Sequence, residues 1–442
     1  MFVKTARPSR LAVGTLALTA AVSILLAGCA APAEPGDKGE TTATLWSLTS
    51  GDQPALEAAI ERWNAANPDQ QVEAEFFASD AYKPKIRTAI GAGRAPTLIF
   101  NWSGGVLEGY VAAGAVEDLS SLVEDNPEVS DRYLPSILEN GVIDGTLYAV
   151  PMNKVNPATM YYNTDLLAEA GVDVPETWDD LIDAIPKLKA IGVAPIALGG
   201  QSRWPELIWL EYLVDRQGGT EVWNSILAGE EGAWDNPAVV DALEKIQELV
   251  ELGAFQDSFA STASNSGSEL ALLYTGKAAI NLQISSQYQT MKAAAPDFLA
   301  SGKLGWAPFP VIEGGEGDPS YVVGSPSNFF SISSDASEGQ KDTARAFLAS
   351  GLFDDTYTTD IVATGAVPPL AGIDTVLSST SDADFLEYVY TQSSEASTFQ
   401  LSWDQALDPS VSDPLLTNLG LIFLGQQTPE EFIVAMNKAS GL

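Results

Sequence analysis

Between residues 43 and 100 the chain alternates short apolar runs with amphipathic stretches, and this order constrains the fold more than any other feature. The first amphipathic stretch carries Leu56, Ile60 and Trp63 at helical spacing, with Asp52 as its expected N-terminal cap. The apolar runs have the length of buried strands. A strand–helix–strand–helix–strand order predicts a parallel sheet with helices on both faces, which is the α/β class. The expected strands are residues 43–48, 71–77, 97–100 and, later, 277–282; further helices are expected at 81–93 and 178–190.

The N-terminus has the features of an export signal. A basic start with Lys4, Arg7 and Arg10 precedes an apolar run that ends in Leu26-Ala-Gly-Cys29. Leu-Ala-Gly-Cys resembles the lipobox of bacterial lipoproteins, in which the cysteine becomes the lipidated first residue of the mature chain. We therefore expect residues 1–28 to be a lipoprotein signal peptide, Cys29 to be lipidated, and residues 29–40 to form a flexible tether. The alternative is an uncleaved membrane anchor, for which the apolar run is short.

Length and charge limit the kind of protein that remains after the signal. The 442-residue chain has 22 basic and 59 acidic residues, and removal of residues 1–28 takes away three basic ones, so the formal charge becomes −40. Such a surface repels nucleic acids and anionic lipids, and it accepts a neutral ligand more easily than an anionic one. The 414 residues left predict two domains or more.

The absence of histidine excludes several kinds of active site. The chain has no histidine, and Cys29 is its one cysteine. Catalytic triads, paired-histidine zinc sites and disulfides are therefore excluded from the mature chain. No phosphate-binding loop or calcium loop is present, and we expect neither a cofactor nor a metal. A glycosidase needs only two carboxylates, so that class of enzyme remains open at this point.

Aromatic side chains are the residues best suited to ligand binding here. The chain has ten Trp and thirteen Tyr. A saccharide offers a C–H face, on which Trp can stack, and a rim of hydroxyls that Asp, Asn, Gln and Ser can bind. Core packing is the competing explanation for any single Trp. Trp63, on the apolar face of a helix, and Trp178, next to the expected cap Thr177, are expected in the core.

Several segments together carry a resemblance to a known family. The chain resembles the family 1 extracellular sugar-binding proteins of ABC importers, and among them those that bind oligosaccharides such as xylobiose or raffinose-type sugars. The resemblance covers nearly all of the mature chain. Its marks are Phe76-Phe-Ala-Ser-Asp-Ala-Tyr82, Asn101-Trp-Ser-Gly-Gly105, Tyr148-Ala-Val-Pro151, Tyr161-Tyr-Asn-Thr-Asp165, Pro175-Glu-Thr-Trp-Asp-Asp180, Trp204-Pro205 and Phe309-Pro-Val-Ile-Glu-Gly-Gly315.

The resemblance implies a two-lobe α/β fold of the periplasmic-binding-protein type (type II), with the ligand in a cleft between lobes joined by three crossing segments. The crossings are expected near Val150, near Gly324 and at 366–368. Lobe 1 would be residues 41–150 and 325–368, and lobe 2 residues 151–323 and 369–442. The implied function is capture of a neutral di- or oligosaccharide by a monomeric, non-catalytic protein. It would be lipid-anchored on the extracytoplasmic face of the cell membrane and would deliver its ligand to an ABC-type importer through the permease subunits.

The resemblance also implies ligand-binding residues. Trp102 has independent support, because it directly follows an expected strand, and open α/β sheets bind ligands at the carboxyl ends of their strands. One departure concerns Ser286, which stands where relatives usually have a Trp, so the length and identity of the sugar stay open. The expected binding residues are Trp46, Asp80, Tyr82, Asn101, Trp102, Asn153, Asn156, Trp204, Gln283, Ser285, Trp403 and Asp404.

Two other functions stay open on the sequence alone. One is a secreted glycoside hydrolase, although no particular pair of acids stands out. The other is a binding protein for a solute that is not a sugar, such as a peptide or a polyol.

Overall fold

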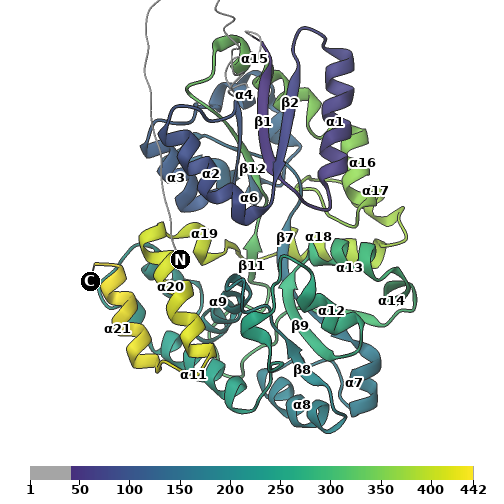
Figure 1. The fold of residues 1–442 in the computed structure, drawn as a ribbon, viewed down its shortest axis with the longest axis vertical. Coiled ribbons are helices and arrows are strands. Elements are labelled where there is room, and N and C mark those ends of the chain that lie inside the picture. Colours follow the sequence, from purple (N-terminus) through teal and green to yellow (C-terminus); the bar gives the residue numbers. More distant parts are fainter. Residues whose placement is uncertain (1–40, 442) are drawn as a thin grey trace, which may run out of the picture.

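The computed structural model describes residues 41–441, except for the side chain of Asp80, and within that range the chain forms two lobes stacked along the long axis (Figure 1). The expected signal peptide, tether and lipidation site at Cys29 lie outside the described residues. No helix within the described range is both long and apolar enough to cross a bilayer.

The first lobe is built on a five-stranded sheet in the order β2-β1-β3-β12-β6. The three expected strands near the N-terminus are present and parallel, with Ala43 opposite Val72 and Leu45 opposite Leu98. β12 returns antiparallel to β3, and β6 pairs with β12. The strands are β1 (Ala43–Leu48), β2 (Val72–Phe77), β3 (Leu98–Asn101), β6 (Val150–Pro151) and β12 (Phe329–Ile332), beside a hairpin of β4 (Val142–Ile143) and β5 (Thr146–Leu147).

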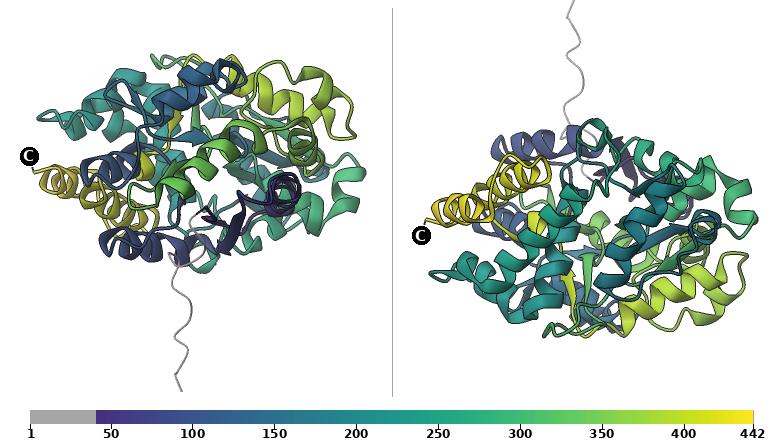
Figure 2. Two further views of the ribbon diagram at one scale, coloured as in Figure 1. Left: turned by 90° about the horizontal axis from the view of Figure 1, so that it is seen from above. Right: turned by 90° about the horizontal axis from the view of Figure 1, so that it is seen from below.

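Helices cover this sheet on both sides, as the alternating sequence predicts (Figures 1 and 2). The expected helix at 81–93 is present but begins two residues earlier, at Ser79. The helices of this lobe are α1 (Gln53–Ala66), α2 (Ser79–Gly91), α3 (Gly104–Ala112), α4 (Ser120–Asp125), α5 (Pro127–Asp131), α6 (Pro135–Leu138), α15 (Glu338–Ala346) and α16 (Asp355–Ala363).

The second lobe has its own sheet, in the order β13-β11-β7-β9-β8, with β10 also paired to β7. Its long central strand β7 is buried along its whole length. The expected strand at 277–282 is present and extends to Ile284. The strands are β7 (Asn156–Asn163), β8 (Ala194–Ala197), β9 (Ala278–Ile284), β10 (Leu304–Ala307), β11 (Val322–Ser325) and β13 (Phe399–Leu401).

One helix of the second lobe, α9, is buried on every side from Pro205 to Arg216 and forms the centre of this lobe. The helix expected at 178–190 is confirmed, and Thr177 caps it by accepting from Asp180 N at 3.1 Å. The helices are α7 (Thr164–Ala170), α8 (Trp178–Ala190), α9 (Trp204–Gly218), α10 (Thr220–Leu227), α11 (Pro237–Glu251), α12 (Ser268–Tyr274), α13 (Gln287–Ala294), α14 (Pro296–Ala300), α19 (Trp403–Ala406), α20 (Pro409–Phe423) and α21 (Pro429–Ala439).

The chain passes between the two sheets more than once. β6 lies in the first sheet and β7 in the second, whereas β11 lies in the second and β12 in the first. Later, α16 packs on α1, and the chain continues through α17 (Asp374–Ser378) to α18 (Ala383–Ser394), which packs on β7. In this last passage Val367 O accepts from Val155 N at 2.9 Å, so the segment runs beside the first one.

A buried ion pair ties the first passage to lobe 1. Asp52 occupies the N-terminal cap position of α1, but its side chain makes no capping hydrogen bond, so the expected cap is wrong. The Asp52 carboxylate instead pairs with the ammonium of Lys154 and accepts from Asn153 Nδ2 at 2.9 Å. Burial alone would raise the pKa of Asp52, but the Lys154 charge and its hydrogen bond overcome this effect and lower the pKa.

Candidate functional site

A cavity of about 700 Å³, here called the central cavity, lies between the two lobes. The volume includes space that is open to solvent. Both lobes contribute to its wall, and so does the end of β11, from which the chain passes to β12. The lining residues are Ser79, Lys83 and Trp102 from lobe 1; Trp204, Ile208, Asn265, Ile284, Ser402, Asp404 and Gln405 from lobe 2; and Gly324 and Ser325 from the end of β11.

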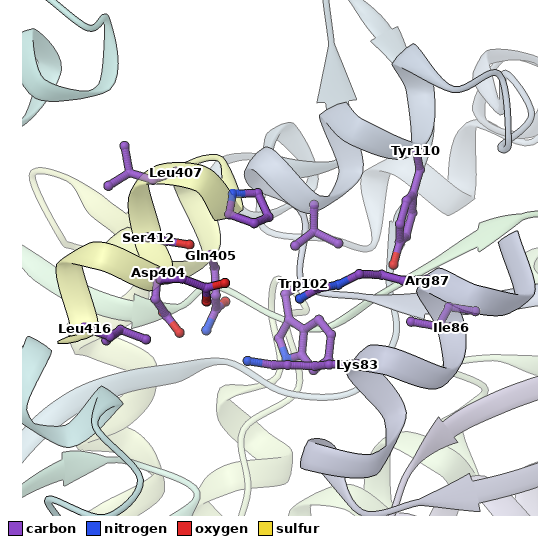
Figure 3. Close-up of a pocket in the computed structure, with 13 residues that line it drawn as sticks. Lys83, Ile86, Arg87, Trp102, Tyr110, Asp404, Gln405, Leu407, Ser412 and Leu416 are labelled. Atoms are coloured by element: carbon purple, nitrogen blue, oxygen red, sulfur yellow. The ribbon is translucent and has the colours of Figure 1, made fainter. Parts of the chain in front are cut away.

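A second cavity of about 640 Å³, here called the outer cavity, shares Lys83, Trp102, Asp404 and Gln405 with the first. Figure 3 shows these side chains together between α2 on one side and α19 and α20 on the other. The remaining lining residues are Ile86, Arg87, Val106 and Tyr110 from lobe 1, and Leu407, Pro409, Ser412, Asp413 and Leu416 from lobe 2.

Buried neighbours hold Trp102 at the boundary between the two cavities. Asn101 is fully buried; its Nδ2 donates to Ser331 Oγ at 3.0 Å, and its Oδ1 accepts from Ser103 N at 3.0 Å. Ser103 adopts a positive φ of 63°, a strained conformation that such hydrogen bonds can hold. Tyr82 is also fully buried and donates to Phe100 O at 2.6 Å. Asn101 and Tyr82 therefore position the Trp102 loop and do not line either cavity.

The Trp102 ring is half-buried and is packed against edges of other rings. Phe100 lies 5.0 Å and Tyr82 5.9 Å from it, both in edge-to-face geometry. The Lys83 ammonium lies 5.3 Å from the centre of the ring. Asp80 belongs to the first turn of the same helix as Lys83, and its side chain is outside the described part of the structure.

In the second lobe, the segment at 402–404 is fixed by a buried acid. Glu211 Oε1 accepts from Trp403 N at 2.6 Å and from Ser402 Oγ at 2.7 Å. The Trp403 ring is 1% exposed and stacks on Trp223 with centroids 4.7 Å apart, so it belongs to the core of lobe 2. The next residue, Asp404, lines both cavities. Burial raises the pKa of Asp404, and the positive charge of Lys83 across the cleft partly offsets this shift.

Two more parts of lobe 2 complete the central cavity. Trp204 begins α9 and lines the cavity directly. Gln283 is fully buried, and its Nε2 donates to Ser264 Oγ at 2.8 Å and to Glu269 Oε2 at 3.1 Å. Ser264 precedes Asn265, which lines the cavity, so Gln283 supports the wall from behind.

The remaining expected binding residues lie away from the central cavity. Trp46 packs against Phe77 in the core of lobe 1, with centroids 5.3 Å apart, and β1 continues to Leu48 beyond it. Asn153 belongs to the Asp52 network. Asn156 opens β7, and its Oδ1 is buried without a hydrogen-bond partner.

Ser285 and Ser286 line a small cavity of about 170 Å³ next to 365–367. Ser285 Oγ donates to Val155 O at 3.3 Å. The position at which relatives usually have a Trp therefore faces the passages between the lobes, and Ile284 is the nearby residue that lines the central cavity.

The lobes touch closely beside the cavities. α3 begins with Gly104 and Gly105, and a methyl group placed on Gly105 would lie 2.9 Å from Ala406 O and 3.0 Å from Leu407 O. On Gly104 it would lie 2.9 Å from Gln405 O. Since these are backbone atoms of the other lobe, the two glycines permit a contact that a larger residue would prevent.

The acidic side chains that line the central cavity bear on whether it could act as a glycosidase. Among the described residues that line the central cavity, Asp404 is the one acid. A glycosidase uses two carboxylates that flank the scissile bond. Within residues 41–441 no group of acids, His or Cys could hold a metal ion.

Sequence reasoning missed Lys83, Asn265 and Gln405, which line the central cavity. Lys83 is next to Tyr82, which the sequence analysis selected, but no sequence signal distinguished these two neighbours. No sequence signal identified Asn265, because it lies in a loop and its place depends on the contact between Ser264 and Gln283.

Comparisons with known proteins agree with this architecture. The family profile of the bacterial extracellular solute-binding proteins matches residues 46–355. A curated ABC transporter extracellular-binding protein of Pyrococcus horikoshii is 25% identical over 284 residues, which are 62% of this chain. The chain spans about 57–63% of the length of the first curated relatives that it matches.

Solved structures extend the similarity to nearly the whole chain. One, from work on xylan utilization by the thermophilic bacterium Caldanaerobius polysaccharolyticus, has a TM-score of 0.79 and 30% identity, covering 90% of this chain and 99% of that one. A chitin oligosaccharide binding protein has a TM-score of 0.80 at 24% identity, covering 91% of this chain and 99% of that one, which shows a shared fold.

Proposed function

We propose that this chain, which belongs to the family of bacterial extracellular solute-binding proteins, captures a neutral di- or oligosaccharide and delivers it to an ABC-type importer. One observation carries the proposal: Trp102 of lobe 1 and Asp404 of lobe 2 line the same cavity between the lobes. An aromatic face and a carboxylate on opposite walls suit a ligand with an apolar face and a rim of hydroxyls.

The other lining residues fit the same ligand chemistry. Trp204 offers a second aromatic side chain, and Asn265, Gln405 and Ser325 offer groups that both donate and accept hydrogen bonds. Hydrogen bonds from sugar hydroxyls to Asp404 would be charge-assisted and therefore stronger than neutral ones. The 30% identity to the structure from the work on xylan utilization favours a saccharide derived from xylan.

Ligand binding is proposed to favour the closed arrangement of the lobes. A ligand that touches both walls stabilises the closed state relative to the open one, which is a population shift. We retain the lobe boundaries 41–150 with 325–368 and 151–323 with 369–442. The placement of β6 and β12 in one sheet and of β7 and β11 in the other supports them.

The cellular setting is part of the proposal. The signal at 1–28 and lipidation of Cys29 would hold the monomer on the extracytoplasmic face of the membrane, next to the permease subunits that receive the sugar. The surplus of acidic residues suits a soluble domain that does not adsorb to anionic lipid. We propose no enzymatic activity, because the family to which the chain belongs is one of solute-binding proteins.

A thermal-shift panel tests the proposal. The mature protein is melted with neutral saccharides of increasing length, with charged peptides and with nucleotides. A saccharide at 100 times its Kd should stabilise the fold by about 2.7 kcal/mol, because it binds the folded state only. Stabilisation by a peptide and by no saccharide would overturn the proposed saccharide ligand. Hydrolysis of any saccharide in the panel would instead favour the alternative function, a secreted glycoside hydrolase.

A further inference from the structure

The outer cavity continues the central cavity past Trp102. Four residues, Lys83, Trp102, Asp404 and Gln405, line both, so the two cavities adjoin at these side chains. Figure 3 shows Trp102 among the residues that line the outer cavity, with Lys83 beside it and Asp404 and Gln405 opposite. A molecule that stacks on Trp102 in the central cavity would therefore lie next to the outer one.

In the outer cavity the positively charged side chains belong to lobe 1 and the negatively charged ones to lobe 2. Lys83 and Arg87 lie one helical turn apart on α2 and face Asp404 of the second lobe, and Asp413 of that lobe lines the same cavity. In the part of the chain that the structure describes, no ion pair involves any of these four groups. Lys83, Arg87 and Asp413 can therefore hydrogen-bond a ligand, and Asp404, which already has a hydrogen bond with Ser402, keeps part of its acceptor capacity.

A neutral polyhydroxylated ligand fits this distribution better than an ion does. A hydroxyl group donates to a carboxylate and accepts from an ammonium or guanidinium group, so it can bind both walls. An anionic sugar would meet Asp404 and Asp413, and a cationic one would meet Lys83 and Arg87. Tyr110, whose pKa is raised to about 12 by burial, adds a neutral hydroxyl.

We propose that the outer cavity is a second saccharide subsite, so that the ligand is an extended neutral oligosaccharide that occupies both cavities and passes Trp102. This inference rests on the proposed function and specifies its substrate class. It places Arg87 and Leu416, which line the outer cavity alone, among the residues that determine the preferred length of the ligand.

Calorimetric titration with a series of one to five sugar units, of the type that stabilises the protein most, tests the subsite. In the wild type, affinity should rise with length by about tenfold or more before it levels off. Leu416→Trp fills the outer cavity and should remove this gain while leaving the affinity for the shortest ligand unchanged. Leu424→Trp is the matched control, because Leu424 is 45% exposed near the end of the same helix.

Arg87→Met provides a second variant that keeps the apolar stem of the side chain. It should weaken binding of the long ligands several-fold and spare the short ones. Affinity that does not depend on length in the wild type, or an equal loss for all lengths in Leu416→Trp, would overturn the subsite and leave the proposed function intact. Failure of every saccharide to bind would overturn both.

Discussion

Gly105→Ala should weaken ligand binding without weakening the fold. In the structure, the added methyl group would lie 2.9 Å from Ala406 O and 3.0 Å from Leu407 O, which are closer than carbon–oxygen contacts normally come. Both oxygens belong to the backbone of α19 and the residue after it, in the other lobe, so no side chain can rotate to make room. The methyl group therefore opposes this contact between the lobes, which we propose to belong to the closed state.

The size of the effect follows from where the clash falls. Overpacking by a methyl group costs about 1–3 kcal/mol. If only the closed, ligand-binding state bears this cost, the apparent Kd rises by about 5- to 150-fold. Gly105 does not have a positive φ, so the substitution adds no backbone strain, and alanine favours the helix over glycine by about 0.8–1.0 kcal/mol.

Gly109→Ala is the matched control on the same helix. A methyl group at Gly109 has no atom within 4 Å, so this variant should bind like the wild type and melt at the same or a higher temperature. Calorimetric titration and thermal melting of both variants measure the two effects separately. The reasoning is refuted if Gly105→Ala binds with wild-type affinity, or if it lowers stability while its folded fraction binds normally.

Four further outcomes are expected. Trp102→Ala should lower saccharide affinity by about 5- to 150-fold, by analogy with base–aromatic stacking, with little change in melting of the free protein; unchanged calorimetric affinity would remove Trp102 from the site. Trp403→Ala should instead cost about 3–5 kcal/mol of stability in denaturant titrations, and a near-neutral result would contradict its core position. Burial raises the pKa of Glu206 to about 8 from 4.5. The stability that the protonated carboxyl contributes is therefore present below pH 4.5 and is lost as pH rises through 8. Glu206→Gln should flatten the pH dependence of the melting temperature in this range, and an unchanged dependence would refute the raised pKa. Cys29→Ser should release the protein from the membrane fraction or leave it unprocessed, and unchanged processing and fractionation on immunoblots would argue against lipidation.

The sequence predicted the first sheet well because its elements are local. The strands at 43–48, 71–77 and 97–100 lie within one or two residues of β1, β2 and β3, since apolar runs and helical spacing can be recognised in short windows. The pairing of β12 with β3 joins residues more than 200 positions apart, and no local pattern encodes it. Periodicity therefore indicates the α/β class, and the two-lobe arrangement needed the family resemblance.

The sequence identified the binding site only in part, because adjacent residues in the chain can point to different places. Asn101 ends β3 and Trp102 follows it, but Asn101 turns inward to Ser331 while Trp102 lines the cavity. Trp403 and Asp404 divide in the same way, with the ring in the core and the carboxylate in the cavity. Neighbouring side chains point in different directions, and the direction depends on tertiary contacts that the sequence does not display.

Tyr82 shows the same limit of sequence reasoning. It was expected to bind ligand because it follows the strand at 71–77. Its side chain instead turns into lobe 1, where it is fully buried and packs edge to face against Trp102. Lys83, the next residue, lines the cavity instead.

The crystal structure of the mature protein with its most stabilising saccharide tests the central claim most directly. The account predicts a sugar ring against Trp102, hydrogen-bonded to Asp404 of the opposite lobe, with Gly105 in contact with Ala406. A saccharide bound outside the space between the lobes, or touching one lobe only, would contradict it.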